Sequence, residues 1–277
     1  MIGRPGMTLP AAGVARVPAL TRWGLGGAQF GNLYRRTTSA EVTATVNAAW
    51  DNGIRYFDTA PHYGLGLSER RLGVALRGRP RGEYVVSTKV GRLLEANPEY
   101  AGELDHDEGF AVPARLRRRW DFSRDGVLRS IEESLDRLGL DRVDIAYLHD
   151  PEAHWRQALD EALPTLLQLR EEGVISAVGA GMTEATLLAD LVRSHDVDLV
   201  MCAGRHTLLE QANDLMAAAQ ERGVGVVVAG VFNSGLLART RPAADGRYDY
   251  APAPPAVLER AHALLAVCER HGISLPH

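Results

Sequence analysis

The sequence contains few of the residues that build disulfide scaffolds and metal clusters. Its 277 residues include only two cysteines, Cys202 and Cys268, and they lie too far apart for a zinc motif or a disulfide framework. No apolar run approaches the roughly 20 residues of a membrane span, and no secretory signal is evident. A net charge of −4 gives no general attraction to nucleic acid or to an anionic membrane. These features predict a cytoplasmic protein without a nucleic-acid or membrane partner.

Lysine is almost absent as well. Of 31 basic residues, Lys89 is the only lysine and the other 30 are arginine. Since arginine supplies the charge elsewhere, this lysine is a candidate for a task that needs a compact ammonium whose pKa responds to its surroundings. Chance survival of one lysine is the alternative interpretation.

Strands and helices alternate along most of the chain. Residues 1–15 are rich in glycine, proline and alanine and predict a flexible lead, whereas residues 16–277 predict one domain. Short apolar runs alternate with helical patterns at the intervals of βα units, which predicts an α/β fold with a parallel sheet. Counting from Arg22 gives seven strands, each followed by a helix. A (β/α)8 TIM barrel needs eight such units, so we expect a barrel that lacks its eighth β/α unit and is incomplete at the C-terminus.

One connection is unusually long. Residues 91–121 predict a loop between the third strand and the third helix, with an acidic part (95–108) and a basic part (115–119). Loops of this length are usually functional. The basic run either binds a phosphate or is solvated and offsets the nearby acids, and the second interpretation is favoured.

Polar residues gather at the carboxyl ends of the predicted strands, where barrel enzymes place their chemistry. The residues at these ends are Asp58, Lys89, His149, Arg205 and Asn233. Tyr63 follows Asp58 in a loop. An ammonium paired with a carboxylate favours the phenolate of a nearby tyrosine and lowers its pKa, and such a tyrosine exchanges protons with a carbonyl or alcohol oxygen. The alternative is structural: Asp58 caps backbone amides and Tyr63 packs by its ring.

Other common chemistries are not supported. The glycines at 24–27 do not form a Gly-x-Gly-x-x-Gly fingerprint, so a Rossmann site is not predicted. His62 and His149 have no partners at metal-ligand spacing, and we predict no metal site. The Gly-x-Ser-x-Gly pattern of many serine hydrolases is also missing.

Three segments resemble the signatures of the aldo-keto reductase family: Gly53–Gly64, Val86–Lys89 and Asp144–His149. The resemblance runs from about residue 16 to the end. Finer features at 120–123, 178–182, 203–209 and 232–237 resemble the branch of D-threo-aldose (L-fucose) dehydrogenases and pyridoxal 4-dehydrogenases. The family's catalytic tetrad falls on Asp58, Tyr63, Lys89 and His149.

The resemblance also implies a cofactor, NADP or NAD, and the residues that bind it. Gly181 and Met182 are expected near the nicotinamide carboxamide, His206 against its ring, and 232–236 around the pyrophosphate. The full cofactor set is Gly26, Gly27, Gly181, Met182, Arg205, His206, Phe232, Asn233, Ser234, Gly235 and Leu236. His62 and Trp120 are expected to line the substrate pocket.

The function implied is hydride transfer between the nicotinamide and a carbonyl or alcohol substrate. In this scheme Tyr63 is the general acid or base, Lys89 tunes it, Asp58 holds Lys89, and His149 orients the substrate oxygen. The expected substrate is an aldose hemiacetal oxidised to a lactone, or a pyridoxal-like aldehyde, and the protein is expected to be a monomer or weak homo-oligomer. The alternative is a non-catalytic, truncated barrel that acts as a binding or regulatory subunit.

Overall fold

The computed structural model describes residues 18–106 and 108–276. The expected flexible lead at 1–15 lies outside this range. The chain divides into two compact units, one formed by residues up to 180 with 197–199, the other by 181–196 with 200–277. The single domain expected over 16–277 stays a prediction.

Seven strands form one sheet in the order β1-β2-β3-β6-β7-β8-β9. Register partners within it run in parallel, as expected for successive βα units. The strands are β1 (Gly24–Gly26), β2 (Tyr56–Asp58), β3 (Val85–Val90), β6 (Ile145–His149), β7 (Ala177–Met182), β8 (Leu199–Ala203) and β9 (Gly225–Ala229). The seven strands predicted from the sequence are therefore confirmed, and β7 and β8 contribute residues to both units.

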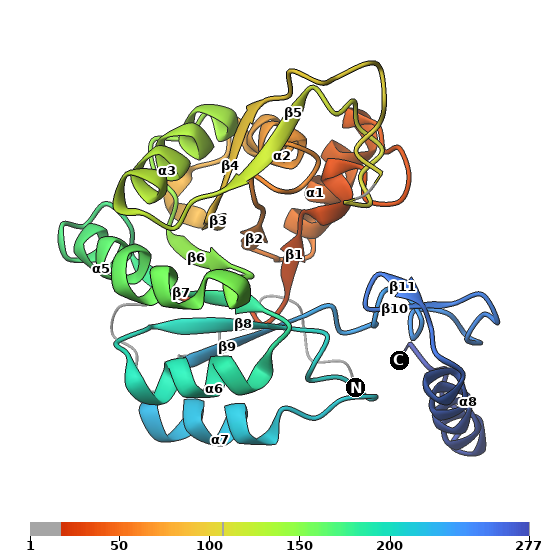
Figure 1. Ribbon diagram of the computed structural model, residues 1–277. Helices are drawn as coiled ribbons and strands as arrows, with labels where there is room; N and C mark the ends of the chain where they lie inside the picture. Colours follow the sequence, from red (N-terminus) through yellow and green to blue (C-terminus); the bar gives the residue numbers. More distant parts are fainter. Residues whose placement is uncertain (1–17, 107, 277) are drawn as a thin grey trace. The chain divides into compact units, whose positions relative to one another are not determined.

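Helices follow the strands in the predicted order. They are α1 (Ser39–Asp51), α2 (Leu67–Leu76), α3 (Arg124–Leu138), α4 (Trp155–Gln157), α5 (Leu163–Glu171), α6 (Ala185–Ser194), α7 (Asn213–Arg222) and α8 (Pro255–Arg270). In the first unit, α2 packs between α1 and α3 (Figure 1). Gly73 permits this approach, because a Cβ there would lie 1.9 Å from the carbonyl oxygen of Leu138. In the second unit, α6 packs against α7.

Local capping explains where several helices begin and end. Ser123 caps α3 by accepting a hydrogen bond from the Gly126 amide, and Gly139 ends the helix in a left-handed conformation. The start of α1 is capped as well. Thr38 is the N-cap, and with Glu41 it forms a complete capping box.

The helical segment that follows β6 is not regular. A π-helical turn at Ala158–Ala162 joins α4 to α5. Pro164 lies just beyond it, in the first turn of α5. Because proline has no backbone N–H and its ring excludes a normal preceding turn, the helix widens at this point.

The predicted long loop contains a hairpin that the sequence analysis missed. Strand β4 (Arg92–Ala96) pairs antiparallel with β5 (Leu116–Trp120), so the expectation of an unstructured 91–121 loop was wrong. Leu93 and Leu94 are buried and supply apolar surface that stabilises the hairpin. The basic run at 115–119 therefore lies largely on a strand.

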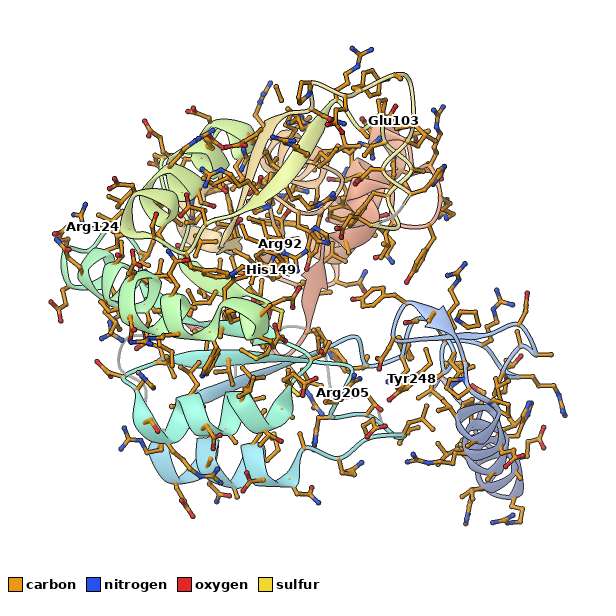
Figure 2. The ribbon with its side chains drawn as sticks, in the orientation of Figure 1. Arg92, Glu103, Arg124, His149, Arg205 and Tyr248 are labelled. Atoms are coloured by element: carbon orange, nitrogen blue, oxygen red, sulfur yellow. The ribbon has the colours of Figure 1, made fainter. Side chains whose placement is uncertain are left out.

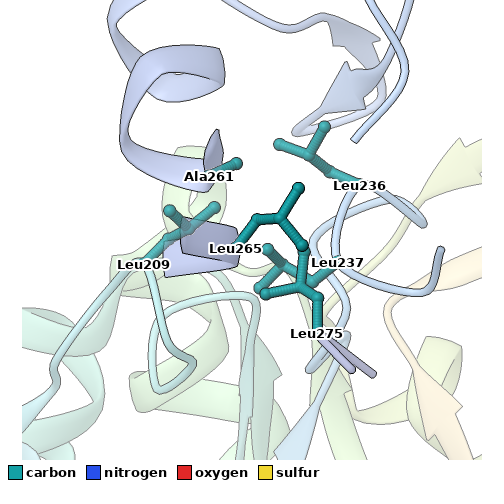
Figure 3. Packing of buried hydrophobic residues seen from close by; sticks show 6 residues of the cluster. All are labelled: Leu209, Leu236, Leu237, Ala261, Leu265 and Leu275. Atoms are coloured by element: carbon teal, nitrogen blue, oxygen red, sulfur yellow. The ribbon is translucent and has the colours of Figure 1, made fainter. Parts of the chain in front are cut away.

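The second unit has an apolar cluster of its own, built around α8 (Figure 3). Its buried members are Leu209, Leu236, Leu237, Ala261, Leu265 and Leu275. A short hairpin of β10 (Arg247–Tyr248) and β11 (Ala251–Pro252) adds Tyr248 to the edge of the cluster. No helix within the described residues is long and apolar enough to span a membrane.

Candidate active site

The predicted lysine lies at the centre of a buried hydrogen-bond network in the first unit. Lys89 is the next-to-last residue of β3, and 2% of its surface is exposed. Its Nζ donates to Asp58 Oδ2 at 2.6 Å, to the Thr59 carbonyl oxygen at 3.1 Å and to Tyr63 Oη at 2.9 Å. The ammonium thus uses its three N–H donors on three oxygens, and it joins the predicted acid to the predicted tyrosine.

The parallel register explains why these residues meet. Asp58 on β2 is the register partner of Ser87 on β3, and Lys89 that of Tyr147 on β6. The carboxyl ends of neighbouring parallel strands lie at one edge of a sheet. Asp58 and Lys89 therefore meet at the edge where His149 ends β6.

Asp58 is held by groups that the sequence analysis did not identify. Ser87 Oγ donates to Asp58 Oδ1 at 2.7 Å, and Tyr56 Oη lies 3.0 Å from Ser87 Oγ and 3.2 Å from Tyr147 Oη. Both carboxylate oxygens of Asp58 are thus engaged. Alternation along the strands placed these hydroxyls inside, but their pairing depends on the register, which the sequence does not specify.

Burial determines the charge state of the site. Desolvation lowers the pKa of Lys89, but the attraction of Asp58 and the bonds to Asp58 and Tyr63 outweigh it, so the Lys89 pKa is raised and the ammonium persists. Burial lowers the pKa of His149 well below its usual range, and Arg92 and Lys89 add to the effect. His149 is therefore a neutral imidazole at physiological pH.

Tyr63 differs from the sequence-based expectation. Burial raises the pKa of its phenol, and Lys89 opposes that rise without reversing it. Lys89 does lower the Tyr63 pKa, as predicted, but burial raises it by more, so the pKa is raised overall. Tyr63 is therefore protonated at neutral pH, which suits a proton donor in the direction of carbonyl reduction.

These charge states predict a distinctive pH profile. In alcohol oxidation the Tyr63 phenolate is the base, so kcat should rise with pH and still be rising at the ordinary tyrosine pKa of about 10. In reduction the protonated phenol is needed, so kcat should stay level over that range. Since His149 is already neutral, neither direction should show an inflection near the ordinary histidine pKa of about 6.5. Steady-state rates measured in both directions check this, and an oxidation plateau near pH 7 would contradict it.

His62, predicted to line the substrate pocket, lies against the tetrad. Its ring centroid is 5.9 Å from that of Tyr63 and 5.5 Å from that of His149. Arg92 Nη1 lies 3.0 Å from His62 Nδ1, and Arg118 Nε donates to the same atom at 2.6 Å. Because a guanidinium only donates, Nδ1 must accept and the proton is on Nε2. Burial and both arginines lower the His62 pKa, so this tautomer stays neutral.

Both arginines come from the β4–β5 hairpin. Arg118 forms a two-bonded ion pair with Asp105 at 2.8 and 2.7 Å, and Arg119 bonds Glu95 and Asp121. The interpretation that the basic run offsets nearby acids is thus confirmed for these two residues. The position of Arg92 beside the tetrad was not foreseen, although its place three residues after Lys89 was a usable signal.

Trp120, the other predicted pocket residue, is the register partner of Arg92 on the hairpin. The Arg92 guanidinium lies 4.3 Å from the centre of the indole ring. The ring stacks on Phe122 at 5.9 Å and keeps 40% of the residue exposed. Trp120 is therefore linked to the tetrad through Arg92 and His62, and Arg92 lies beside His149 (Figure 2).

Two of the predicted cofactor residues belong to the first unit. Gly26 ends β1 and is the register partner of Asp58. A Cβ on Gly27 would lie 2.7 Å from both the Asp58 carbonyl oxygen and Ser68 Oγ, and Ser68 Oγ donates to the Gly27 carbonyl at 2.7 Å. The backbone at Gly27 thus leaves no room for a side chain.

The other predicted cofactor residues belong to the second unit. Gly181 and Met182 end β7 and are buried. Arg205 pairs with Asp249 at 2.8 and 2.7 Å and lies 6.0 Å from the Tyr248 ring centre (Figure 2). His206 Nδ1 accepts from the Ala212 amide at 3.3 Å. The Arg205 guanidinium is therefore paired with the Asp249 carboxylate in this structure.

The turn at 232–236 has features that suit a polar ligand. Asn233 and Ser234 are left-handed, with φ of 45° and 55°, and the ring of Phe232 is exposed. Asn233 Oδ1 is buried and has no hydrogen-bond partner among the described residues. The amides of Asn233, Gly235 and Leu236 donate to the carbonyl oxygens of Gly230, Phe232 and Asn233, respectively. Cofactor binding by these amides stays a prediction and requires those bonds to open.

The geometry of this site is typical of one class of enzyme. A tyrosine bonded to a buried ammonium, at the carboxyl edge of a parallel sheet and beside a neutral histidine, suits barrel enzymes that interconvert carbonyls and alcohols. The model of the Aldo/keto reductase family matches residues 22–277. The chain belongs to this family and is an oxidoreductase of the kind that uses a nicotinamide dinucleotide.

Individual relatives agree with this assignment. The chain is 52% identical over 270 residues to a D-threo-aldose 1-dehydrogenase of Pseudomonas sp, covering 96% of this chain and 81% of the relative. It is 36% identical over 293 residues to a pyridoxal 4-dehydrogenase of Microbacterium luteolum, covering 99% and 82%. The structure of a glycerol dehydrogenase from Gluconobacter oxydans matches with a TM-score of 0.72 at 23% identity, covering 100% of this chain and 81% of that one. The predicted barrel fold is confirmed, and the alternative of a non-catalytic subunit is not favoured.

Proposed function

We propose that this protein oxidises the cyclic hemiacetal of an aldose to a lactone. The observation that carries the proposal is the Lys89 ammonium, which bonds Asp58 and Tyr63 at once. The choice of an aldose is supported by the 52% identity to a D-threo-aldose 1-dehydrogenase. A pyridoxal-like substrate is the second candidate, supported by the 36% identity to a pyridoxal 4-dehydrogenase.

Each tetrad residue has a distinct part in the proposed reaction. Tyr63 Oη takes the proton of the C1 hydroxyl as the C1–O bond becomes a carbonyl. Lys89 stabilises the Tyr63 phenolate that accepts this proton, because a charge in a desolvated site interacts strongly. Asp58 fixes the position of Lys89, and neutral His149 holds the reacting oxygen by a hydrogen bond.

A bound nicotinamide dinucleotide, NAD or NADP, would supply the hydride acceptor. In the first unit, Gly26 and Gly27 are proposed to bind it. In the second unit the proposed residues are Gly181, Met182, Arg205, His206, Phe232, Asn233, Ser234, Gly235 and Leu236. Two features support this assignment: Asn233 Oδ1 is buried without a hydrogen-bond partner among the residues that the structure describes, and the ring of Phe232 is exposed.

Two measurements test the proposal. NADH and NADPH are titrated against the protein while nucleotide fluorescence is followed, and we expect saturable binding of at least one. L-fucose and pyridoxal are then supplied with NAD and with NADP, and reduced nucleotide and product are measured. Aldose oxidation with lactone formation supports the proposal. Saturable nucleotide binding with turnover of pyridoxal alone would transfer the assignment to the second candidate.

A further inference from the structure

Two charged side chains lie beside the tetrad without a part in the proton transfer described above. Arg92 Nη2 donates to Asp150 Oδ2 at 2.5 Å, and the same carboxylate oxygen lies 3.6 Å from His149 Nε2. A substrate oxygen held by His149 therefore brings its neighbouring atoms close to the Asp150 carboxylate. Because Arg92 and Asp150 lie this close to the position of the reacting oxygen, they are candidates for substrate recognition.

The backbone of Asp150 is held in an unusual conformation. Its φ is 43°, in the left-handed region that non-glycine residues rarely occupy, and it precedes Pro151, a position that favours extended backbone. Such strain persists only where the surroundings enforce it, and it is common at active sites. The Asp150 side chain keeps 38% of its surface exposed, so a ligand can reach the carboxylate.

Arg92 is fixed from three sides. Besides Asp150 it contacts His62 Nδ1 at 3.0 Å and lies 4.3 Å from the ring centre of Trp120. Only 11% of its side chain is exposed. Burial raises the pKa of Asp150, and Arg92 opposes that rise without reversing it. The hydrogen bond of 2.5 Å from Arg92 Nη2 to Asp150 Oδ2 places a donor and an acceptor side by side.

Donor, acceptor and aromatic face together match the chemistry of a sugar. A pyranose presents hydroxyls that both donate and accept along its edge and C–H groups on its face. Asp150 accepts, Arg92 donates, and the half-exposed indole of Trp120 offers an apolar surface. A hydroxyl-free aldehyde would shield this ion pair from water without supplying a hydrogen bond in return, which costs binding energy.

We propose that Arg92 and Asp150 determine specificity by binding the hydroxyl on the carbon next to the reacting one, so that the site selects polyhydroxylated hemiacetals over aldehydes without hydroxyls. This inference rests on the proposed aldose oxidation. It goes further by assigning selectivity to two residues outside the tetrad.

The test compares two aldoses and two forms of the enzyme. kcat/KM is measured for oxidation of L-fucose and of 2-deoxy-L-fucose by the wild type and by Asp150→Asn. Hydrogen bonds to charged groups are worth about 10- to 150-fold, so the wild type should prefer L-fucose by a factor in this range and Asp150→Asn should lose most of that preference. A double cycle of this kind isolates the interaction between one side chain and one hydroxyl.

Two further measurements guard against a merely structural effect. Arg92→Lys, which keeps the charge but not the fork of donors, should also narrow the preference. Asp160→Asn, which makes the same chemical change in an exposed helical pair, should leave it at the wild-type value. Thermal denaturation shows whether each variant is folded. If Asp150→Asn does not fold, the preference of Arg92→Lys tests the inference in its place.

The outcomes separate this inference from the proposed function. If the wild type oxidises L-fucose but Asp150→Asn and Arg92→Lys lower kcat/KM equally for both sugars, the inference is wrong and aldose oxidation stands. If the wild type reduces benzaldehyde yet oxidises no aldose, both are wrong. A lost preference in either variant, with the Asp160→Asn control unchanged, supports the inference.

Discussion

Tyr63→Phe is expected to lower kcat by about 10²- to 10⁴-fold, the usual contribution of a positioned acid or base. The substitution removes the Tyr63 hydroxyl, the proposed proton-transfer group, which lies 2.9 Å from Lys89 Nζ. It retains the ring, which lies 5.7 Å from His149 and 6.3 Å from Phe110, centre to centre. Lys89 keeps its bonds to Asp58 and Thr59, so the loss should appear in the chemical step and not in folding.

Single-turnover kinetics with saturating nucleotide measure that step directly. The matched control is Tyr100→Phe, which removes a hydroxyl from a residue of the long connection outside the tetrad; its kcat should stay at the wild-type value. Nucleotide affinity should be unchanged in both variants. If Tyr63→Phe turns over within a few-fold of the wild type, Tyr63 is not the proton-transfer group.

Lys89→Met is expected to abolish measurable turnover and to lower the free energy of unfolding by about 3–5 kcal/mol, as when one partner of a buried ion pair is removed. Asp58 is 7% exposed and would lose its bond of 2.6 Å to the ammonium. Ser87 still bonds its other oxygen, but a hydroxyl does not neutralise a buried carboxylate. Urea denaturation followed by circular dichroism measures the loss.

The double variant Lys89→Met/Asp58→Asn separates stability from chemistry. It removes both charges, so most of the lost stability should return while turnover stays absent. Arg156→Met serves as the exposed control, because its partner Asp160 is itself largely solvated, and surface pairs of this kind contribute little. If Lys89→Met has the same free energy of unfolding as Arg156→Met, the Lys89–Asp58 ion pair does not stabilise the fold.

Much of the site follows from the sequence because parallel strands bring their carboxyl ends together. Asp58, Lys89 and His149 each end an apolar run, so their convergence needed only the alternation of strands and helices. The β4–β5 hairpin was not predictable in the same way. Its strands are separated by residues 97–115, and neither Arg-Leu-Leu-Glu-Ala nor Leu-Arg-Arg-Arg-Trp alternates apolar and polar residues. The pairing therefore depends on contacts between segments distant in the chain.

The protonation states of the site residues could not be predicted from the sequence pattern either. The direction of the Tyr63 pKa depends on how completely the phenol is removed from water, and burial of a loop residue is not visible in its neighbours. The same holds for His62, whose tautomer is fixed by two arginines from the hairpin. Ser87 and Tyr147 were overlooked because a hydroxyl inside a strand is more often a packing residue.

The burial of Lys89 removes the only lysine amine of the chain from solvent in the folded protein. It is the only lysine in the sequence, and its Nζ is enclosed by three oxygens with 2% of the residue exposed. Acylating reagents should therefore reach this amine only when the edge of the sheet opens. The rate of acylation at Lys89, read by mass spectrometry, becomes a reporter of transient opening at the catalytic centre.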